Sequence, residues 1–292
     1  MHARLIAHLP DHAAASRTLH AGDVVCVGRG EGCGLQVAHS SVSRRHAELR
    51  LEAGEWRLRD LDSKNGTQVD GRAVAEASLR DGAWLRLGDV YCEFRVLSDR
   101  EAEAGERRLQ ARRLRATALT AGLQPVTGFG DLLDGSLHAV IELAHCSRGF
   151  VLLRDGDDYL VRAHHALDPS KLQRREFSGS AGALQRALQE RRAVVVNDVG
   201  SEPWACTRES VVASGLRSLI CLPLLDGDAP LGAIYADRRE AGEAIDTLDL
   251  ELLQAFAERA TLYIVARRAS DALGARDAPR WRGPVAAQAP AA

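Results

Sequence analysis

The N-terminal third of the chain alternates apolar and polar side chains with the period of a β-strand. "AELRLEAGEWRLRDL" alternates on both sides of Ala53-Gly54, as a half-buried hairpin does, and "AWLRLGDVYCEFRV" repeats this pattern around Gly88-Asp89. Turn residues separate these short segments, and no stretch of useful length has the helical period. Residues 1–98 are therefore predicted to form an all-β sandwich.

The pattern changes after residue 98. Residues 99–123, "DREAEAGERRLQARRLRATALTAGL", are charged, rich in alanine and free of proline, which predicts a helix. A heptad of apolar positions runs through this segment, but Gly105 and Arg112 occupy its partner positions. The segment is therefore predicted to be a helical linker, with only a weak coiled-coil signal.

Residues 124–268 mix both periods, which predicts an α+β domain. Helical spacing is seen in "DLLDGSLHAVIELAHCS" and in a last helix that begins near Asp246-Thr247, whereas "AVVVNDV", "SLICLPLL" and "PLGAIYAD" have the composition of central strands. A further helix, "SAGALQRALQERR", has Ser178 or Ser180 as its N-cap. Residues 269–292 are rich in Ala and Pro and are predicted to be a disordered tail.

Composition narrows the class of protein. Hydrophobic residues make up 46% and charged residues 27% of the 292 residues, as is typical of globular proteins, and this length accommodates two domains. The formal charge of −2 argues against a nucleic-acid-binding surface spread over the whole molecule. The six cysteines form no CxxC pair, so no metal site is predicted. The absence of a signal-peptide pattern and of a membrane-length apolar run predicts a cytoplasmic protein without a membrane partner.

Candidate chemistry is concentrated in "VGRGEGCGLQVAHSSVSRRHAELR", which has four glycines within seven residues and then paired arginines. A dinucleotide fingerprint fails because Cys33 stands at its third glycine position, and the chain has no Gly-Lys pair for a P-loop. Ser43 and His46 are expected to point to opposite faces, so they do not form a nucleophile and its base. The stretch is therefore interpreted as a site that recognises an anion, without catalytic residues.

Three motifs together resemble the forkhead-associated (FHA) domain over roughly residues 1–97. They are "GR" at Gly28-Arg29, "SVSRRHAEL" at 41–49 and "DLDSKNGTQVDG" at 60–71, and they have the order and spacing of that family. The resemblance implies a β-sandwich that binds phosphothreonine peptides through loops at one end.

The resemblance also implies a role for each motif residue. An arginine offers a planar fork of N–H donors to phosphate oxygens, a serine its hydroxyl and backbone N–H, and an asparagine both a donor and an acceptor to the peptide backbone. The expected phosphopeptide-binding residues are Arg29, Ser43, Arg44, Lys64 and Asn65. The residues expected to support the loops are Gly28, His46, Gly66 and Thr67.

Residues from about 125 to 268 resemble a GAF domain, a small-molecule sensory fold with a central antiparallel sheet. "RGFVLLRDGDDYLVRAHHALD", "VVVNDVGSEPW" and "GLRSLICLPLLDGDAPLGAIYADRR" carry the resemblance. No cyclic-nucleotide signature or bilin-type Cys-His pair is present, so no cofactor is expected and the ligand is unknown. Cys206 and Cys221 are interpreted as ordinary thiols rather than redox sensors. Helices that flank such domains commonly pair, which predicts a homodimer.

These features predict a non-enzymatic bacterial signalling adaptor that docks a phosphothreonine-containing partner, either a Ser/Thr protein kinase or its substrate. One alternative is a DNA-associated transcriptional regulator component that acts with a separate ATPase and DNA-binding effector. The other is a cryptic cyclic-nucleotide enzyme. Arginines upstream of Thr117 and Thr120 in "RRLRATALT" also resemble a basophilic kinase site, so phosphorylation there could supply a ligand to a neighbouring chain.

Overall fold

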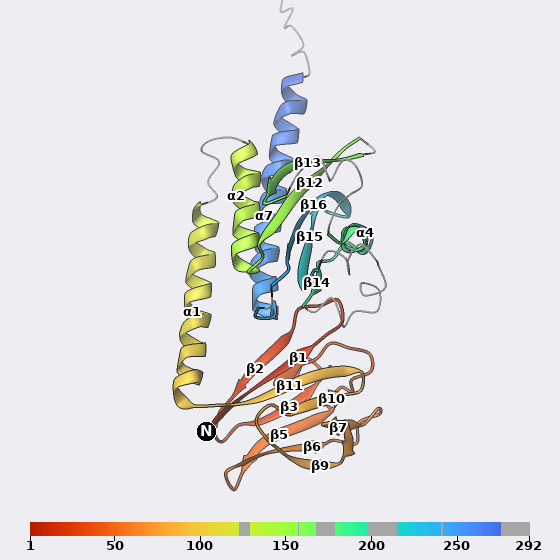
Figure 1. Ribbon diagram of the computed structural model, residues 1–292. Helices are drawn as coiled ribbons and strands as arrows, with labels where there is room; N and C mark the ends of the chain where they lie inside the picture. Colours follow the sequence, from red (N-terminus) through yellow and green to blue (C-terminus); the bar gives the residue numbers. More distant parts are fainter. Residues whose placement is uncertain (123–128, 157, 168–178, 198–214, 241, 276–292) are drawn as a thin grey trace, which may run out of the picture.

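The structure is a computed structural model that describes residues 1–122, 129–156, 158–167, 179–197, 215–240 and 242–275. Its N-terminal part consists of two β-sheets (Figure 1), with strand orders β2-β1-β11-β10-β7-β8 and β4-β3-β5-β6-β9. The strands are β1 (His2–His8), β2 (Ala15–Leu19), β3 (Val24–Gly28), β4 (Leu35–Gln36), β5 (Ala47–Glu52), β6 (Glu55–Asp60), β7 (Thr67–Val69), β8 (Arg72–Val74), β9 (Glu76–Leu79), β10 (Trp84–Leu87) and β11 (Val90–Leu97).

Alternating burial explains why these residues form a sandwich. In β1 every second side chain is buried, and β11 alternates in the same way over most of its length. The buried faces of the two sheets meet in one apolar cluster, in which the rings of Trp56 and Phe94 pack edge to face at 6.3 Å between centroids. The hairpin β5–β6 turns at Ala53 and Gly54, both of which have a positive φ. The predicted all-β sandwich is confirmed.

The C-terminal part is α+β, as predicted. Its antiparallel sheet has the order β13-β12-β16-β15-β14. The elements after the sandwich are α1 (Asp99–Gly122), α2 (Phe129–Leu143), β12 (Arg148–Asp155), β13 (Asp158–His165), α4 (Ala181–Glu190), β14 (Val194–Val196), β15 (Ser218–Asp226), β16 (Ala229–Arg238) and α7 (Thr247–Ala275). Helices α2 and α7 cover one face of this sheet and α4 lies on the other (Figure 1).

The helix ends show where the sequence interpretation was right and where it was wrong. Ser180 is the N-cap of α4, since its Oγ accepts a hydrogen bond from Ala183 N at 3.1 Å, whereas Ser178 and Cys206 lie outside the described residues. Helix α7 runs on to Ala275, so the tail predicted from residue 269 is wrong for residues 269–275. Its apolar side chains pack against the core as far as the fully buried Ile264 and the partly buried Val265. Residues 276–292 lie outside the described part.

The loop between β1 and β2 reaches from the sandwich to the C-terminal part (Figure 1). Ala14 N donates to Ile245 O at 3.0 Å, and Thr247 N donates to Ala14 O at 3.1 Å. The carboxylate of Asp11 lies 2.6 Å from Arg186 Nη1 of α4. The two parts are thus joined by non-covalent contacts as well as by α1. Among the described residues, no helix is long and apolar enough to span a bilayer.

Candidate functional site

The end of β3 lies directly beneath the loop 37–46. Arg29 N donates to Ser43 O at 3.0 Å, and Gly30 N donates to Arg44 O at 3.1 Å. A Cβ at Gly28 would overlap the carbonyl group of Arg44, so only glycine allows the two backbones to come this close. Gly28 and Gly30 therefore allow the end of β3 to pack against the backbone of the loop 37–46.

A second loop, 60–67, is organised by the carboxylate of Asp60 at the end of β6. Its Oδ1 accepts from Thr67 Oγ1 at 2.5 Å and from Ser63 Oγ at 2.6 Å, and its Oδ2 accepts from Ser63 N at 2.9 Å. Burial by itself would raise the pKa of Asp60, but these hydrogen bonds outweigh it and lower the pKa. Asp60 thus stays ionised and fixes the segment that carries Lys64 and Asn65.

His46 connects the two loops. Its imidazole is fully buried, its Nδ1 accepts from Ser43 N at 3.1 Å, and its Nε2 lies 3.1 Å from Gly66 O. Because Nδ1 is an acceptor, the ring proton must be on Nε2, and the ring is neutral. Burial accordingly lowers the pKa of His46 below 6.5.

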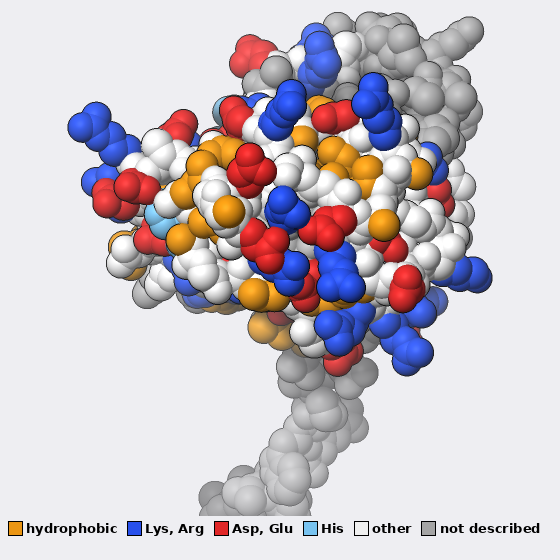
Figure 2. Space-filling view, turned by 90° about the horizontal axis from the view of Figure 1, so that it is seen from below, with side chains coloured by type: hydrophobic (Ala, Val, Ile, Leu, Met, Phe, Trp, Pro, Cys, Tyr) orange, Lys and Arg blue, Asp and Glu red, His pale blue; other side chains and the backbone are white. Residues whose placement is uncertain are grey.

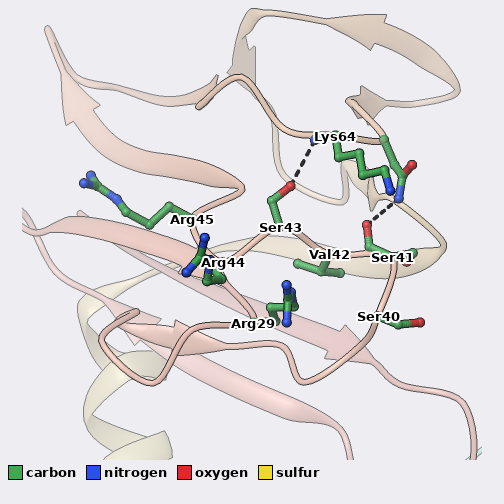
Figure 3. A pocket seen from close by; sticks show the side chains of 9 residues that line it. Arg29, Ser40, Ser41, Val42, Ser43, Arg44, Arg45 and Lys64 are labelled. Carbon is green, nitrogen blue, oxygen red and sulfur yellow. Dashed lines mark hydrogen bonds between the residues drawn. The ribbon is translucent and has the colours of Figure 1, made fainter.

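The two loops enclose a cavity of about 390 Å³ (Figure 3). Arg29, Ser43, Arg44, Lys64 and Asn65, the five residues predicted to bind a phosphopeptide, all line it. Sequence reasoning missed its other lining residues, which are Ser40, Ser41, Val42 and Arg45. The sequence could have indicated them, because all four belong to the run "SSVSRR" that also contains the predicted Ser43 and Arg44.

The hydrogen bonds of the lining residues correct one detail of the sequence interpretation. The N–H group of Ser43 is bonded to His46, so it does not point to a ligand as predicted. Its Oγ accepts from Lys64 N at 3.0 Å, which leaves the hydroxyl proton as the donor of this side chain. Asn65 Nδ2 donates to Ser41 O at 2.7 Å, and this bond uses one of its two amide protons.

The electrostatic character of the cavity is one-sided. Arg29, Arg44, Arg45 and Lys64 contribute four cations, and no carboxylate is among the lining residues. In Figure 3 the guanidinium group of Arg45 extends away from Ser43. The side chain of Arg29 lies below Ser43 and that of Lys64 lies above it. On the face shown in Figure 2, by contrast, acidic and basic side chains are interspersed. The cavity therefore has the charge and donors for an anion.

The α+β part uses its polar residues differently. Arg148 Nε donates to Asp237 Oδ1 at 2.5 Å, Tyr235 Oη donates to Asp237 Oδ2 at 2.8 Å, and Ser180 N donates to Tyr235 Oη at 3.0 Å. All four residues are buried. Burial raises the pKa of Asp237 although Arg148 opposes it, and burial also raises the pKa of Tyr235 well above its usual value. This network holds the sheet to the start of α4.

Comparison with known proteins assigns both parts to families. Residues 25–88 match the FHA domain and residues 126–265 match the GAF domain, so the chain contains an FHA domain followed by a GAF domain. FHA and GAF domains are typically binding domains without catalytic activity. The cavity lies in the FHA domain.

The curated relatives match the chain mainly through the FHA domain. The chain is 39% identical over 81 residues to the glycogen accumulation regulator GarA of Mycolicibacterium smegmatis. The aligned residues make up 28% of this chain and 51% of GarA. It is 38% identical over 80 residues to the FHA domain-containing protein FhaA of Mycobacterium tuberculosis. Here the aligned residues make up 27% of this chain and 15% of FhaA. The chain thus spans about half or less of the relatives it matches.

Solved FHA structures cover about a third of the chain. One comes from an analysis of phosphothreonine-dependent FHA domain interactions and is 32% identical, covering 34% of this chain and 99% of that chain with a TM-score of 0.31. Another is the FhaA FHA domain complexed with the intracellular domain of Rv3910, at 33% identity, covering 32% and 99% of the two chains with a TM-score of 0.29.

Proposed function

We propose that this protein is a non-enzymatic signalling adaptor that binds a phosphothreonine-containing protein in the cavity between the loops 37–46 and 60–67. The observation that carries the proposal is the lining of the cavity: guanidinium, ammonium, hydroxyl and amide groups without a carboxylate. Phosphothreonine carries a charge of about −1.5 to −2 at neutral pH and oxygen atoms that accept hydrogen bonds.

Each lining group has a place in such a complex. The exposed guanidinium groups of Arg29 and Arg44 provide charge and paired donors for phosphate oxygens. The hydroxyl proton of Ser43 provides a further donor, and Lys64 adds a cation. Asn65 keeps its carbonyl oxygen and one amide proton for the backbone of the bound peptide, because only one amide proton is used for Ser41.

The partner that this chemistry selects is a protein phosphorylated on threonine, so a Ser/Thr protein kinase or its substrate acts upstream of the adaptor. The comparison proteins support this inference, because one solved FHA structure comes from an analysis of phosphothreonine-dependent interactions. We propose that the adaptor meets this partner in the cytoplasm. Thr117 is a candidate phosphosite in α1, where its hydroxyl donates to Arg113 O at 3.0 Å; the side chain of Thr120 lies outside the described residues.

For the GAF domain we infer a role in sensing a small molecule or in homodimerisation. Leu262 on α7 and Leu114 on α1 are 70% and 65% exposed, and large apolar side chains on long helices favour contact with a second copy. Light scattering of the full chain would test this role: we expect a dimer for the wild type and more monomer for Leu262→Glu. An unchanged mass for this variant would leave α7 without a role in assembly.

The phosphothreonine proposal is tested with an oriented phosphothreonine peptide library, its unphosphorylated counterpart and a phosphoserine library. We expect retention of the phosphothreonine peptides, and Arg29→Ala is expected to weaken the selected peptides by about 2–3 kcal/mol because it removes a charged two-donor contact. Arg80→Ala is the matched control, because Arg80 is exposed and lies away from the cavity. Its neighbour Leu79 pairs with Trp56 at the start of β6, whereas Asp60 and the cavity lie at the other end of that strand. Equal retention by both variants would contradict the proposal.

A further inference from the structure

Two cysteines bracket the arginine at the base of the cavity. Cys26 lies on β3 and Cys33 lies in the loop between β3 and β4, and their Sγ atoms are 3.4 Å apart. Both residues are partly exposed and both thiols are free. A disulfide has an S–S length of about 2.0 Å, so the two sulfur atoms are only about 1.4 Å farther apart than in a covalent bond.

The chain can close this gap because only one of the two cysteines is held in a sheet. Cys26 pairs with Glu48 in the ladder between β3 and β5, so its backbone is fixed. Cys33 has a glycine on each side. Gly34 is packed against Arg17 and Val25, but a side chain at Gly32 would meet nothing within 4 Å, so the loop has room to move on the N-terminal side of Cys33. The movement needed falls on the loop that begins with Arg29.

The thiol of Cys33 also contacts the cavity-forming loop. Its Sγ donates to Arg44 O at 3.0 Å, the same carbonyl oxygen that accepts from Gly30 N. A disulfide sulfur has no proton, so oxidation abolishes the bond from Cys33 and draws the loop toward β3. Because Arg29 and Arg44 both line the cavity, a change in this contact is transmitted to the anion site.

We propose that Cys26 and Cys33 are a redox-sensitive dithiol, and that its oxidation to an intramolecular disulfide weakens binding in the adjoining cavity. The effect on binding rests on the proposed phosphopeptide function; the disulfide itself does not. With a peroxide as oxidant, one thiolate attacks the peroxide oxygen to form a sulfenic acid and releases hydroxide. The second thiol then displaces the hydroxyl group as water. In total, two thiols and one hydrogen peroxide give one disulfide and two waters.

The environment of the pair sets how it reacts. Burial, and then the hydrogen bond with Cys26, raise the pKa of Cys33 to about 11. Cys33 is therefore mostly protonated at neutral pH, and we expect oxidation to be faster in alkaline buffer, where more thiolate is present. Cys92 and Cys221 are buried in the cores of the two domains, so among the described cysteines they compete least for the oxidant.

The first measurement tests the disulfide in the full chain, before and after treatment with hydrogen peroxide. Trypsin cleavage after the arginines at 17, 29 and 44 places Cys26 in the peptide 18–29 and Cys33 in the peptide 30–44. We expect mass spectrometry without reductant to find these two peptides linked after oxidation, and to find them separate after dithiothreitol. Failure to form the linked pair under conditions that oxidise free glutathione would overturn the proposal.

The second measurement uses the phosphothreonine peptide library as the probe, with the reduced, oxidised and re-reduced protein. Oxidation is expected to weaken retention about fivefold, as for the loss of one hydrogen bond, and dithiothreitol is expected to restore it. Cys33→Ser is the matched control, because its hydroxyl group can still donate to Arg44 O. This variant should bind like the reduced wild type and should not respond to peroxide.

The outcomes separate the two proposals. Equal retention by the linked and reduced wild type, or a similar response of Cys33→Ser to peroxide, would refute the regulatory effect. A reduced wild type that retains no phosphothreonine peptide would refute the proposed function and with it any effect on affinity. In that case the linked peptide pair alone would decide whether Cys26 and Cys33 form a redox-active dithiol.

Discussion

The cavity of the FHA domain and the buried polar network of the GAF domain use arginine in opposite ways. In the FHA domain, Arg29, Arg44 and Arg45 line an exposed cavity, and no ion pair among the described residues involves them. In the GAF domain, Arg148 is buried and bonded to the carboxylate of Asp237. A cation without a carboxylate keeps its attraction for a ligand, whereas a neutralised one serves the fold.

The same difference extends to the neighbouring side chains. The FHA cavity is supported from behind by Asp60 and His46, which hold the loops but do not line it. Around Asp237, the ring of Tyr235 stacks on Phe150 at 5.1 Å between centroids, and its hydroxyl group is bonded on both sides. Filled space and satisfied polar groups indicate a structural role, and open space beside unpaired cations indicates recognition.

The largest expected effect comes from breaking the buried pair of the GAF domain. Arg148→Ala leaves the fully buried Asp237 without its cation, and we expect a loss of about 3–5 kcal/mol in unfolding free energy. Arg162→Ala on the neighbouring strand is the control, because its ion pair with Asp155 is exposed and is expected to contribute less than about 1 kcal/mol. Denaturant unfolding of both variants checks this, and similar losses would contradict the structural role of Arg148.

A smaller loss is expected when the support of the FHA cavity is removed. Asp60→Asn keeps one acceptor oxygen but replaces the other by an NH₂ group, so at least one bond from Ser63 or Thr67 is lost, which should cost about 2 kcal/mol and weaken phosphopeptide binding as well. Asp62→Asn is the matched control in the same loop, since Asp62 is exposed with a φ of 52°, which asparagine tolerates. If the two variants unfold at the same denaturant concentration, Asp60 does not organise the loop.

The contact between the linker helix α1 and the GAF domain is expected to contribute less. Arg112 of α1 contacts the carboxylates of Asp246 and Asp249 at the start of α7, and these three side chains are largely buried. We expect Arg112→Gln to cost about 1–2 kcal/mol and to increase hydrogen exchange at the start of α7. Arg107→Gln is the control, since its ion pair with Glu103 is exposed within α1. Unchanged exchange at residues 246–249 would show that α1 does not hold α7.

Much of this architecture was predictable from the sequence, because local periodicity determines it. The period of two in the segments that form β5, β6, β10 and β11 predicted the sandwich, and the motifs predicted a shared site for Arg29, Ser43 and Asn65, which line one cavity. The role of Asp60 was not predicted, because a carboxylate near an anion site looks unfavourable until its bonds to Ser63 and Thr67 are seen. The bond from Ser43 N to His46 was also missed, because the partner of a backbone N–H group depends on the conformation of the loop and not on residue type.

The contacts between distant elements were outside the reach of sequence patterns. The loop between β1 and β2 carries no motif, yet Ala14 bonds to residues beside α7 and Asp11 bonds to Arg186. The end of α7 was misplaced because the composition of residues 269–275 is similar to that of the tail that follows, and helices can extend beyond their buried stripe.

The smallest expected effect is on the pH dependence of stability. It tests His46, which supports the cavity but does not line it. The pKa of His46 is lowered by burial, so the unfolded state binds a proton near pH 6.5 while the folded state does not. The contribution of neutral His46 to stability is therefore complete above pH 6.5. It is lost as the pH falls from 6.5 toward the pKa of His46 in the folded state, with a slope of no more than about 1.4 kcal/mol per pH unit.

This dependence is measured by urea unfolding between pH 7.5 and pH 5, in roughly half-unit steps, of the wild type, His46→Gln and His12→Gln. We expect a shallower decline for His46→Gln alone, because His12 is exposed and does not join the two loops. Parallel declines in all three proteins would mean that His46 can be protonated in place. Protonated Nδ1 cannot accept from Ser43 N, so the loss of this bond would then leave the folded state no less stable.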